Sequence, residues 1–115
     1  WTRALEAAID ARTAVVCTSH VHWVCGGVVD LARLSRATKA VGAALVLDLT
    51  QSISVVDPDV SACDPDFVVA AGYKWLMGPY SLGLLWVDET LIQPPARSLR
   101  AVHRLAHTGS AYRVG

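Results

Sequence analysis

The sequence lacks a charge surplus and lacks any long apolar run, and these two absences exclude two classes of partner. Ten Lys and Arg side chains balance ten Asp and Glu side chains in 115 residues. No surplus of positive charge therefore marks a surface for nucleic acid or for an anionic membrane. No apolar stretch reaches the roughly 18 residues that a membrane-spanning helix needs. We expect neither nucleic acid nor a membrane among the partners.

Cysteine is scarce and unpatterned. Cys17, Cys25 and Cys63 are odd in number and follow no zinc or redox spacing. We interpret them as reduced thiols, and the N-terminus has no signal-peptide layout, so a cytoplasmic location is expected. His20 and His22 are two positions apart, but no third ligand is in view, so no metal site is expected.

Apolar residues are abundant. They make up 53% of the chain, which is high for a free-standing domain of this size. The chain opens on Trp1 rather than Met and ends at "YRVG" without a closing element. We therefore expect a fragment of a larger protein, in which the excess apolar surface meets parts outside these residues.

The apolar and β-branched runs predict four strands, at 13–20, 44–49, 66–71 and 81–87. Helical patterns cover 2–10 and 31–41, a turn-rich stretch follows the second strand, and a helical turn is expected at 88–93. Asp30 is a good N-cap for the helix at 31–41, and Gly42 is placed as its terminating glycine. The last strand follows a short loop, so it should pair antiparallel, whereas the others should be parallel. The strand at 44–49 is a continuous apolar run, as expected of a strand buried on both faces. The expected fold class is α/β, a mainly parallel sheet flanked by helices.

Polar side chains follow three of these strands. Ser19 and His20 end the first, Asp48 ends the second, and Lys74 lies just past the third. Ligands of such sheets gather at the carboxyl ends of the strands.

Asp48 and Lys74 each allow a plain structural interpretation and a chemical one. The aspartate could cap a turn, and the lysine stem could pack while its ammonium reaches solvent. As a pair they are more informative, because a partly buried lysine is nucleophilic and a carboxylate can hold a cationic heterocycle. Pyridoxal phosphate enzymes combine these two groups.

The segments "LVLDLTQS" and "DFVVAAGYKWLMGPYSLGLLWV" together resemble the class V aminotransferase family of fold-type I pyridoxal phosphate enzymes. The upstream "SHVHWVCGGVVDLARLSRATKAVGA" resembles the same family. The likeness covers about residues 13–88. It implies that residues 1–93 are the central part of the cofactor-binding large domain, and that 94–115 begin the connection toward a C-terminal domain.

The resemblance assigns roles position by position. Lys74 matches the catalytic lysine that forms the imine with the cofactor and moves the substrate α-proton, and Asp48 matches the acid on the pyridine nitrogen. Gln51 matches the glutamine at the phenolic oxygen, with a turn-forming residue as the alternative. Thr50 matches a small residue on one ring face. Tyr73 matches a phosphate donor in several members, with an aromatic packing residue as the alternative.

Some positions differ from the family pattern. Ala71 stands where many members have a serine that binds phosphate, and Ser81 stands where the loop often has glycine. Trp75 and Leu76 are expected in the core, and packing is expected for Trp23. The resemblance implies that the phosphate-binding helix and the aromatic ring stacked on the cofactor lie upstream. It places the arginine for the substrate carboxylate downstream.

The resemblance implies an enzyme that acts on an amino acid as the external aldimine, with aminotransferase as the first choice. A cysteine desulfurase, another lyase or an epimerase is the alternative. An amino acid and a keto acid would be the substrates, and the full-length protein would be a homodimer. Two non-catalytic alternatives remain. One is a binding module for a phosphorylated ligand, although the sequence has neither the GxGxxG nor the P-loop pattern that such a module would need. The other is a degenerate paralogue without catalytic activity.

Overall fold

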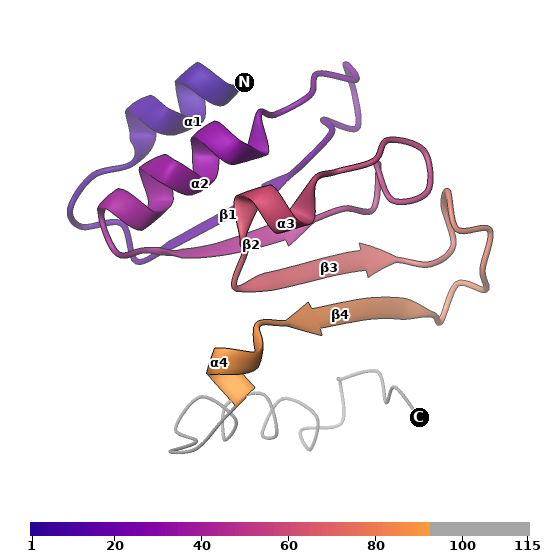
Figure 1. Cartoon of the computed structure of the whole chain (residues 1–115). Coiled ribbons are helices and arrows are strands. Elements are labelled where there is room, and N and C mark those ends of the chain that lie inside the picture. Colours follow the sequence, from indigo (N-terminus) through magenta and orange to yellow (C-terminus); the bar gives the residue numbers. More distant parts are fainter. Residues whose placement is uncertain (93–115) are drawn as a thin grey trace.

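A four-stranded sheet organises the described part of the chain (Figure 1). The structure is a computed structural model and describes residues 1–92. Its strands are β1 (Val15–Ser19), β2 (Ala44–Asp48), β3 (Phe67–Ala71) and β4 (Gly83–Val87). Its helices are α1 (Thr2–Ala8), α2 (Leu31–Ala40), α3 (Val60–Cys63) and α4 (Glu89–Ile92). The expected C-terminal connection at 94–115 lies outside the described residues.

The strands lie side by side in the order of the sequence. β1 pairs parallel with β2, and β2 pairs parallel with β3. β4 returns antiparallel along β3, with Phe67 opposite Val87 and Ala71 opposite Gly83. This topology confirms the expected mainly parallel α/β sheet and its antiparallel last strand.

α2 begins and ends where its sequence predicts. The Asp30 side chain accepts a hydrogen bond from the Arg33 backbone N–H at 3.0 Å, which satisfies one free donor of the first turn. Gly42 follows the helix with φ of +71°, a conformation that costs a glycine little. The buried face of the helix carries Leu34 and Thr38, both fully shielded from solvent.

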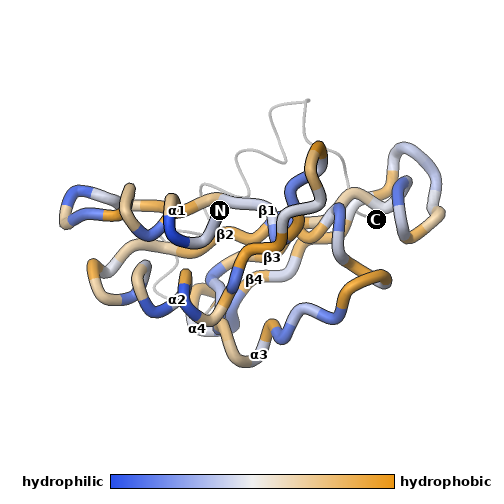
Figure 2. Tube along the Cα trace, turned by 90° about the horizontal axis from the view of Figure 1, so that it is seen from above, coloured by the Kyte–Doolittle hydropathy of each residue, from blue (hydrophilic) through white to orange (hydrophobic). Residues whose placement is uncertain are grey.

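The core lies between the sheet and its helices, on one face of the sheet. Leu45 and Leu47 of β2 and Val16 of β1 are buried, and they pack in one apolar cluster with Leu34 of α2. α2 and α3 lie on the same side of the strands, and α1 packs against α2 (Figures 1 and 2). The hydropathy colouring in Figure 2 shows the apolar character of the strands that this layer covers.

The opposite face of the sheet is only partly covered by the described residues. Val15 and Cys17 of β1 alternate with the buried Val16 and are exposed. β4 is exposed at Gly83 to Trp86. Burial on both faces was expected for the strand at 44–49. In β2, Leu45 and Leu47 are buried and the alternate residues are half-buried, so within residues 1–92 its second face is covered only in part. The apolar runs were predicted correctly as strands.

The turn-rich stretch between β2 and β3 contains the short helix α3, which the sequence pattern did not predict. The Asp59 side chain caps it by accepting from the Ala62 N–H at 3.0 Å, and Asp64 ends it in the left-handed conformation. An ion pair between Lys39 and Asp64 and a hydrogen bond from Ser35 to the Cys63 carbonyl join α2 to this segment. Among the described helices, none combines the length and the apolar character that crossing a membrane requires.

Candidate functional site

Three parallel strands bring their carboxyl ends to one edge of the sheet. Ser19 of β1 lies opposite Asp48 of β2, and Asp48 lies opposite Val69 of β3. The His20 N–H donates to the Asp48 carbonyl at 3.2 Å, and the Leu49 N–H donates to the Val69 carbonyl at 2.8 Å. The polar groups that follow these strands therefore lie along the same edge, as the sequence predicted.

Asp48 is half-buried at the end of β2. Its Oδ1 accepts a hydrogen bond from the Thr50 backbone N–H at 2.8 Å, so the carboxylate does cap the turn that follows the strand. Within residues 1–92, Oδ2 has no hydrogen-bond partner. The turn-capping interpretation and the ligand-binding one are thus compatible, because they use different oxygens.

Lys74 lies in the turn after β3 and is exposed. Its Nζ is 5.9 Å from the centroid of the Tyr73 ring, and no carboxylate within the described part of the chain forms an ion pair with it. Of the two interpretations of Lys74, the one in which its ammonium reaches solvent describes residues 1–92. The nucleophilic role of Lys74 stays a prediction.

Hydrogen bonds join the loop after β2 to the loop that carries Lys74. The Ala71 N–H donates to the Thr50 hydroxyl at 2.9 Å, and the Trp75 indole N–H donates to Gln51 Oε1 at 3.3 Å. The Ser54 hydroxyl donates to the Trp75 carbonyl at 3.1 Å. Trp75 was expected in the core, but its side chain is half exposed and positions Gln51 instead.

Tyr73 and Tyr80 stack on each other across the loop, with ring centroids 4.6 Å apart. The stack supports the packing role that was the alternative for Tyr73. The phenol oxygen of Tyr73 has no partner within residues 1–92, so packing leaves it free as a donor.

The turn itself depends on glycine at position 72. A Cβ at Gly72 would lie 3.0 Å from the Leu82 carbonyl oxygen, and the Gly78 N–H donates to the Gly72 carbonyl at 2.8 Å. Sequence reasoning missed this requirement, although a glycine directly after an apolar strand is a recognisable signal.

The loop after β1 brings His20 to this edge. His20 is buried, with 6% of its surface exposed, and its Nδ1 lacks a hydrogen-bond partner within the described residues. Burial lowers the pKa of this imidazole below its ordinary value.

Trp23, for which packing was expected, is 77% exposed. In residues 1–92 no cluster of three His, Cys, Asp or Glu side chains is placed to hold a metal ion.

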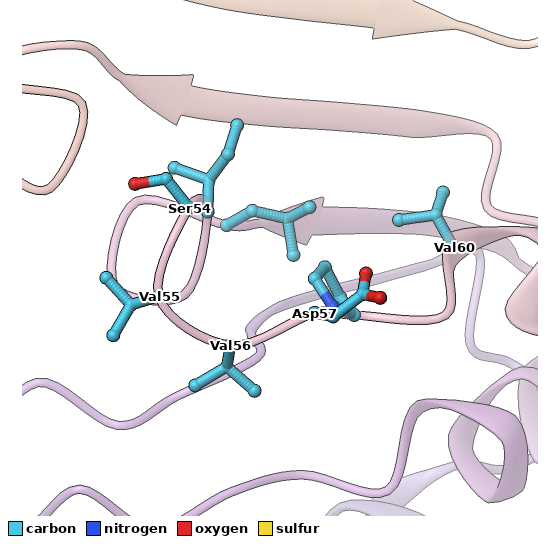
Figure 3. Close-up of a pocket in the computed structure, with 8 residues that line it drawn as sticks. Ser54, Val55, Val56, Asp57 and Val60 are labelled. Carbon is cyan, nitrogen blue, oxygen red and sulfur yellow. The ribbon is translucent and has the colours of Figure 1, made fainter.

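A pocket of about 570 Å³ lies beside the loop after β2 (Figure 3). Its lining is mainly apolar, with Val55, Val56 and Val60 among its residues and Asp57 as its one ionisable side chain. Neither Asp48 nor Lys74 lines it. The pocket therefore lies apart from the pair that the sequence singled out at the strand ends.

The donors and acceptors at this edge fit pyridoxal phosphate. The amine of Lys74 suits its aldehyde, the unbonded Oδ2 of Asp48 suits a protonated ring nitrogen, and the Gln51 side-chain N–H groups suit its phenolic oxygen. Within residues 1–92 the amine forms no ion pair and the Gln51 Nε2 and Tyr73 hydroxyl make no hydrogen bond. The phosphate has no cationic side chain of its own among the polar groups described at this edge.

Curated proteins named cysteine desulfurase are among the relatives of this chain. A protein named probable cysteine desulfurase from Methanothermobacter thermautotrophicus is 34% identical over 82 residues, which is 71% of this chain and 20% of that protein. A cysteine desulfurase from Dickeya dadantii is 38% identical over 93 residues, which is 79% of this chain and 22% of the relative. The chain thus spans about a fifth of the length of the curated relatives it matches.

Solved structures confirm the fold. A cysteine desulfurase from Escherichia coli superposes with a TM-score of 0.69 at 30% identity, over 78% of this chain and 23% of that one. A pyridoxamine-pyruvate aminotransferase from Mesorhizobium loti has a TM-score of 0.66 at 22% identity, over 78% of this chain and 24% of that one, and shows a shared fold. These neighbours are fold-type I enzymes, and the segment corresponds to part of their large domain.

The family assignment rests on nearly the whole chain. The model for the family described as aminotransferase class-V matches residues 2–108. This agrees with the resemblance carried by the "LVLDLTQS" and "GYKWLMGP" segments. The chain belongs to the class-V aminotransferase family, whose members use pyridoxal phosphate.

Proposed function

We propose that the protein is a pyridoxal phosphate-dependent enzyme that acts at the α-carbon of an amino acid. The observation that carries this proposal is the placement of Asp48 at the end of β2 and of Lys74 just after β3, where hydrogen bonds join the segments around the two strand ends. A binding module without covalent chemistry would not need an amine beside a carboxylate with an unbonded oxygen.

Each predicted site residue has a stated role in this proposal. Lys74 Nζ would hold the cofactor at its aldehyde carbon, and it would also take and return a proton at the substrate α-carbon. Asp48 Oδ2 would keep a proton on the ring nitrogen, while Gln51 Nε2 would donate to the phenolic oxygen. Thr50 would provide a small side chain beside the ring, and the Tyr73 hydroxyl would donate to the phosphate. Pyridoxal phosphate, when bound, supplies the electron sink that stabilises the α-carbanion.

Cysteine is the substrate that the relatives favour. The curated proteins at 34% to 38% identity carry the name cysteine desulfurase, and cleavage of a carbon–sulfur bond requires the same lysine and acid. Transamination between an amino acid and a keto acid is the second candidate, because removal of the α-proton is common to both. The intact enzyme would be a homodimer in the cytoplasm.

Borohydride trapping tests the cofactor site. The intact protein is mixed with pyridoxal phosphate, reduced, digested, and searched by mass spectrometry for the lysine that gained the cofactor mass. Lys74 should be labelled selectively, and Lys74→Ala should lose the label and at least about 1000-fold of the activity, as expected when a covalent catalyst is removed.

Lys39 provides the internal control. It is exposed on α2 and pairs with Asp64, away from the strand ends. Equal labelling of Lys39 and Lys74 in a folded protein would contradict a preorganised site and would favour the binding-module alternative.

The products separate the two reactions. Cysteine desulfuration releases alanine and leaves the sulfur as a persulfide on an acceptor thiol, from which an added dithiol reductant releases sulfide. Transamination instead yields a keto acid from the donor and an amino acid from the acceptor. Alanine and, with the reductant present, sulfide from cysteine without a keto acid would support the first candidate, and their absence alongside amino-group transfer would support the second.

A further inference from the structure

The loop after β1 contains a second group of reactive side chains. We propose that Cys25 is a nucleophilic thiol, activated by His22, and that it is a site of covalent modification by disulfide-containing compounds. This proposal does not depend on the cofactor or on the proposed enzymatic activity, because Cys25 and His22 are not among the predicted cofactor residues.

The thiol and the imidazole are in hydrogen-bond contact. Cys25 Sγ lies 3.3 Å from His22 Nδ1. The Val24 backbone N–H donates to Nδ1 at 3.4 Å, which favours the tautomer with an unprotonated Nδ1. In that tautomer the Cys25 thiol is the donor in its contact with Nδ1. This is the arrangement of a nucleophile and its general base.

The Trp1 side chain contacts both His22 and Cys25. Its indole ring stacks on the His22 ring with centroids 4.3 Å apart and planes 15° apart. Its Nε1–H donates to Cys25 Sγ at 3.4 Å, and a donor of this kind stabilises a thiolate more than a thiol. The same contact is the main cause of the lowered pKa of the Cys25 thiol.

The backbone of the loop is closed tightly enough to keep this geometry. Val21 and Val28 form an isolated antiparallel bridge, and the His22 N–H donates to the Gly27 carbonyl at 2.8 Å. A Cβ at Gly27 would lie 2.6 Å from the Trp1 ring, so glycine at this position lets the indole reach the sulfur. The cluster is therefore built by the fold.

The proposed step is thiol–disulfide exchange. The Cys25 proton moves to His22 Nδ1, and the thiolate attacks one sulfur of the disulfide. The new bond joins Cys25 Sγ to that sulfur, the original sulfur–sulfur bond breaks, and the leaving thiolate takes the proton from the imidazolium. The disulfide is the only oxidant, and one thiol is released for each mixed disulfide formed.

The other two cysteines of the chain are internal comparisons. Cys63 is buried, its thiol donates to the Val60 carbonyl at 3.3 Å, and burial raises its pKa. Cys17 is exposed on β1 but has no imidazole beside it among the described residues. Reactivity should therefore follow the order Cys25, Cys17, Cys63.

The experiment measures the reaction of the intact protein with oxidised glutathione at pH 7. Trapping with iodoacetamide and peptide mapping then give the rate at each cysteine. Cys25 should react about tenfold faster than the cysteine of a ten-residue peptide that copies residues 20–29, because the peptide lacks Trp1 and the folded loop. His22→Phe keeps a ring for the stack and removes the base, and it should lower the rate about tenfold.

A rate at Cys25 equal to that of the peptide would overturn the proposal, as would a rate unchanged by His22→Phe. Circular dichroism establishes that the variant folds. If it does not, the rate of the unaltered protein is measured from pH 6 to pH 9. The folded thiol should then keep its reactivity at a lower pH than the peptide, and coincident profiles would refute activation.

Discussion

His20 is the most deeply buried ionisable side chain at the strand ends, and its Nδ1 has no partner among residues 1–92. A charged imidazole is disfavoured there, so the folded pKa lies below the unfolded value of about 6.5. The unfolded chain then binds the proton more readily. The stabilising contribution of the neutral His20 ring to the folded state is fully present above pH 6.5, and it decreases as the pH falls below that value.

We therefore predict that the free energy of unfolding decreases by up to about 1.4 kcal/mol per pH unit below pH 6.5 through His20 alone. Urea denaturation between pH 7 and pH 5 measures it. His20→Asn, which retains a small polar group, should flatten the dependence. His22→Asn is the matched control and should leave it in place, so a slope lost equally in both variants would contradict this assignment.

The sequence predicted the positions of Asp48 and Lys74 better than their surroundings. Strand ends follow from apolar runs and their bounding turns, so both side chains were placed at the correct edge of the sheet. Exposure could not be predicted for Lys74, Trp75 and Trp23, because it depends on which chain segments lie opposite them. The hydrogen bond from Trp75 to Gln51 was also missed, since it joins two loops that are distant in sequence.

Among the helices, those with strong local sequence signals were predicted and α3, with weak signals, was missed. α2 has a capping aspartate, an apolar face at helical spacing and a terminating glycine, and it was predicted in full. α3 has only four residues, fewer than the spacing pattern needs, and lies among prolines and aspartates. Its one local signal was the Asp59 cap, which also fits a turn.

Gly42→Ala tests the end of α2. At φ of +71° an L side chain is strained, although a Cβ there would meet no atom within 4 Å. We expect the free energy of unfolding to fall by about 1 kcal/mol, all of it from the backbone. Urea denaturation checks this result.

Gly83→Ala is the matched control for that substitution. Its Cβ would lie 3.5 Å from the Ala70 carbonyl oxygen, an ordinary contact, and its φ is not left-handed. The change should stay within about 0.5 kcal/mol. Equal losses in the two variants would show that the added methyl group, rather than the backbone angle, is responsible.

At the scale of the whole molecule, the sheet has one covered face and one that residues 1–92 leave open. β4 also has an outer edge to which no described strand is paired. Leu84, Leu85 and Trp86 are each about half exposed, so this edge is apolar as well as unpaired. Such an edge favours association with other chains.

We predict that residues 1–92, prepared alone, associate at micromolar concentration and bind a hydrophobic dye. Leu85→Lys places a charge on the exposed face of β4 and should shift the segment toward monomer in analytical ultracentrifugation. Ala40→Lys adds the same charge at the exposed end of α2 and should not. A monomeric segment without dye binding would contradict the prediction.

The hydrogen bonds between the two site loops have a consequence for biosynthesis. Each of these bonds joins residues 21 to 24 positions apart, and together they connect the segment that begins at Thr50 to the segment around Lys74. When only β1, α2 and β2 have emerged from the ribosome, the nascent chain presents the Asp48 carboxylate without the Lys74 amine. In the proposed site, Asp48 and Lys74 thus come together only after β3 and its turn have left the exit tunnel, which would make vitamin capture a late event in the life of the nascent chain.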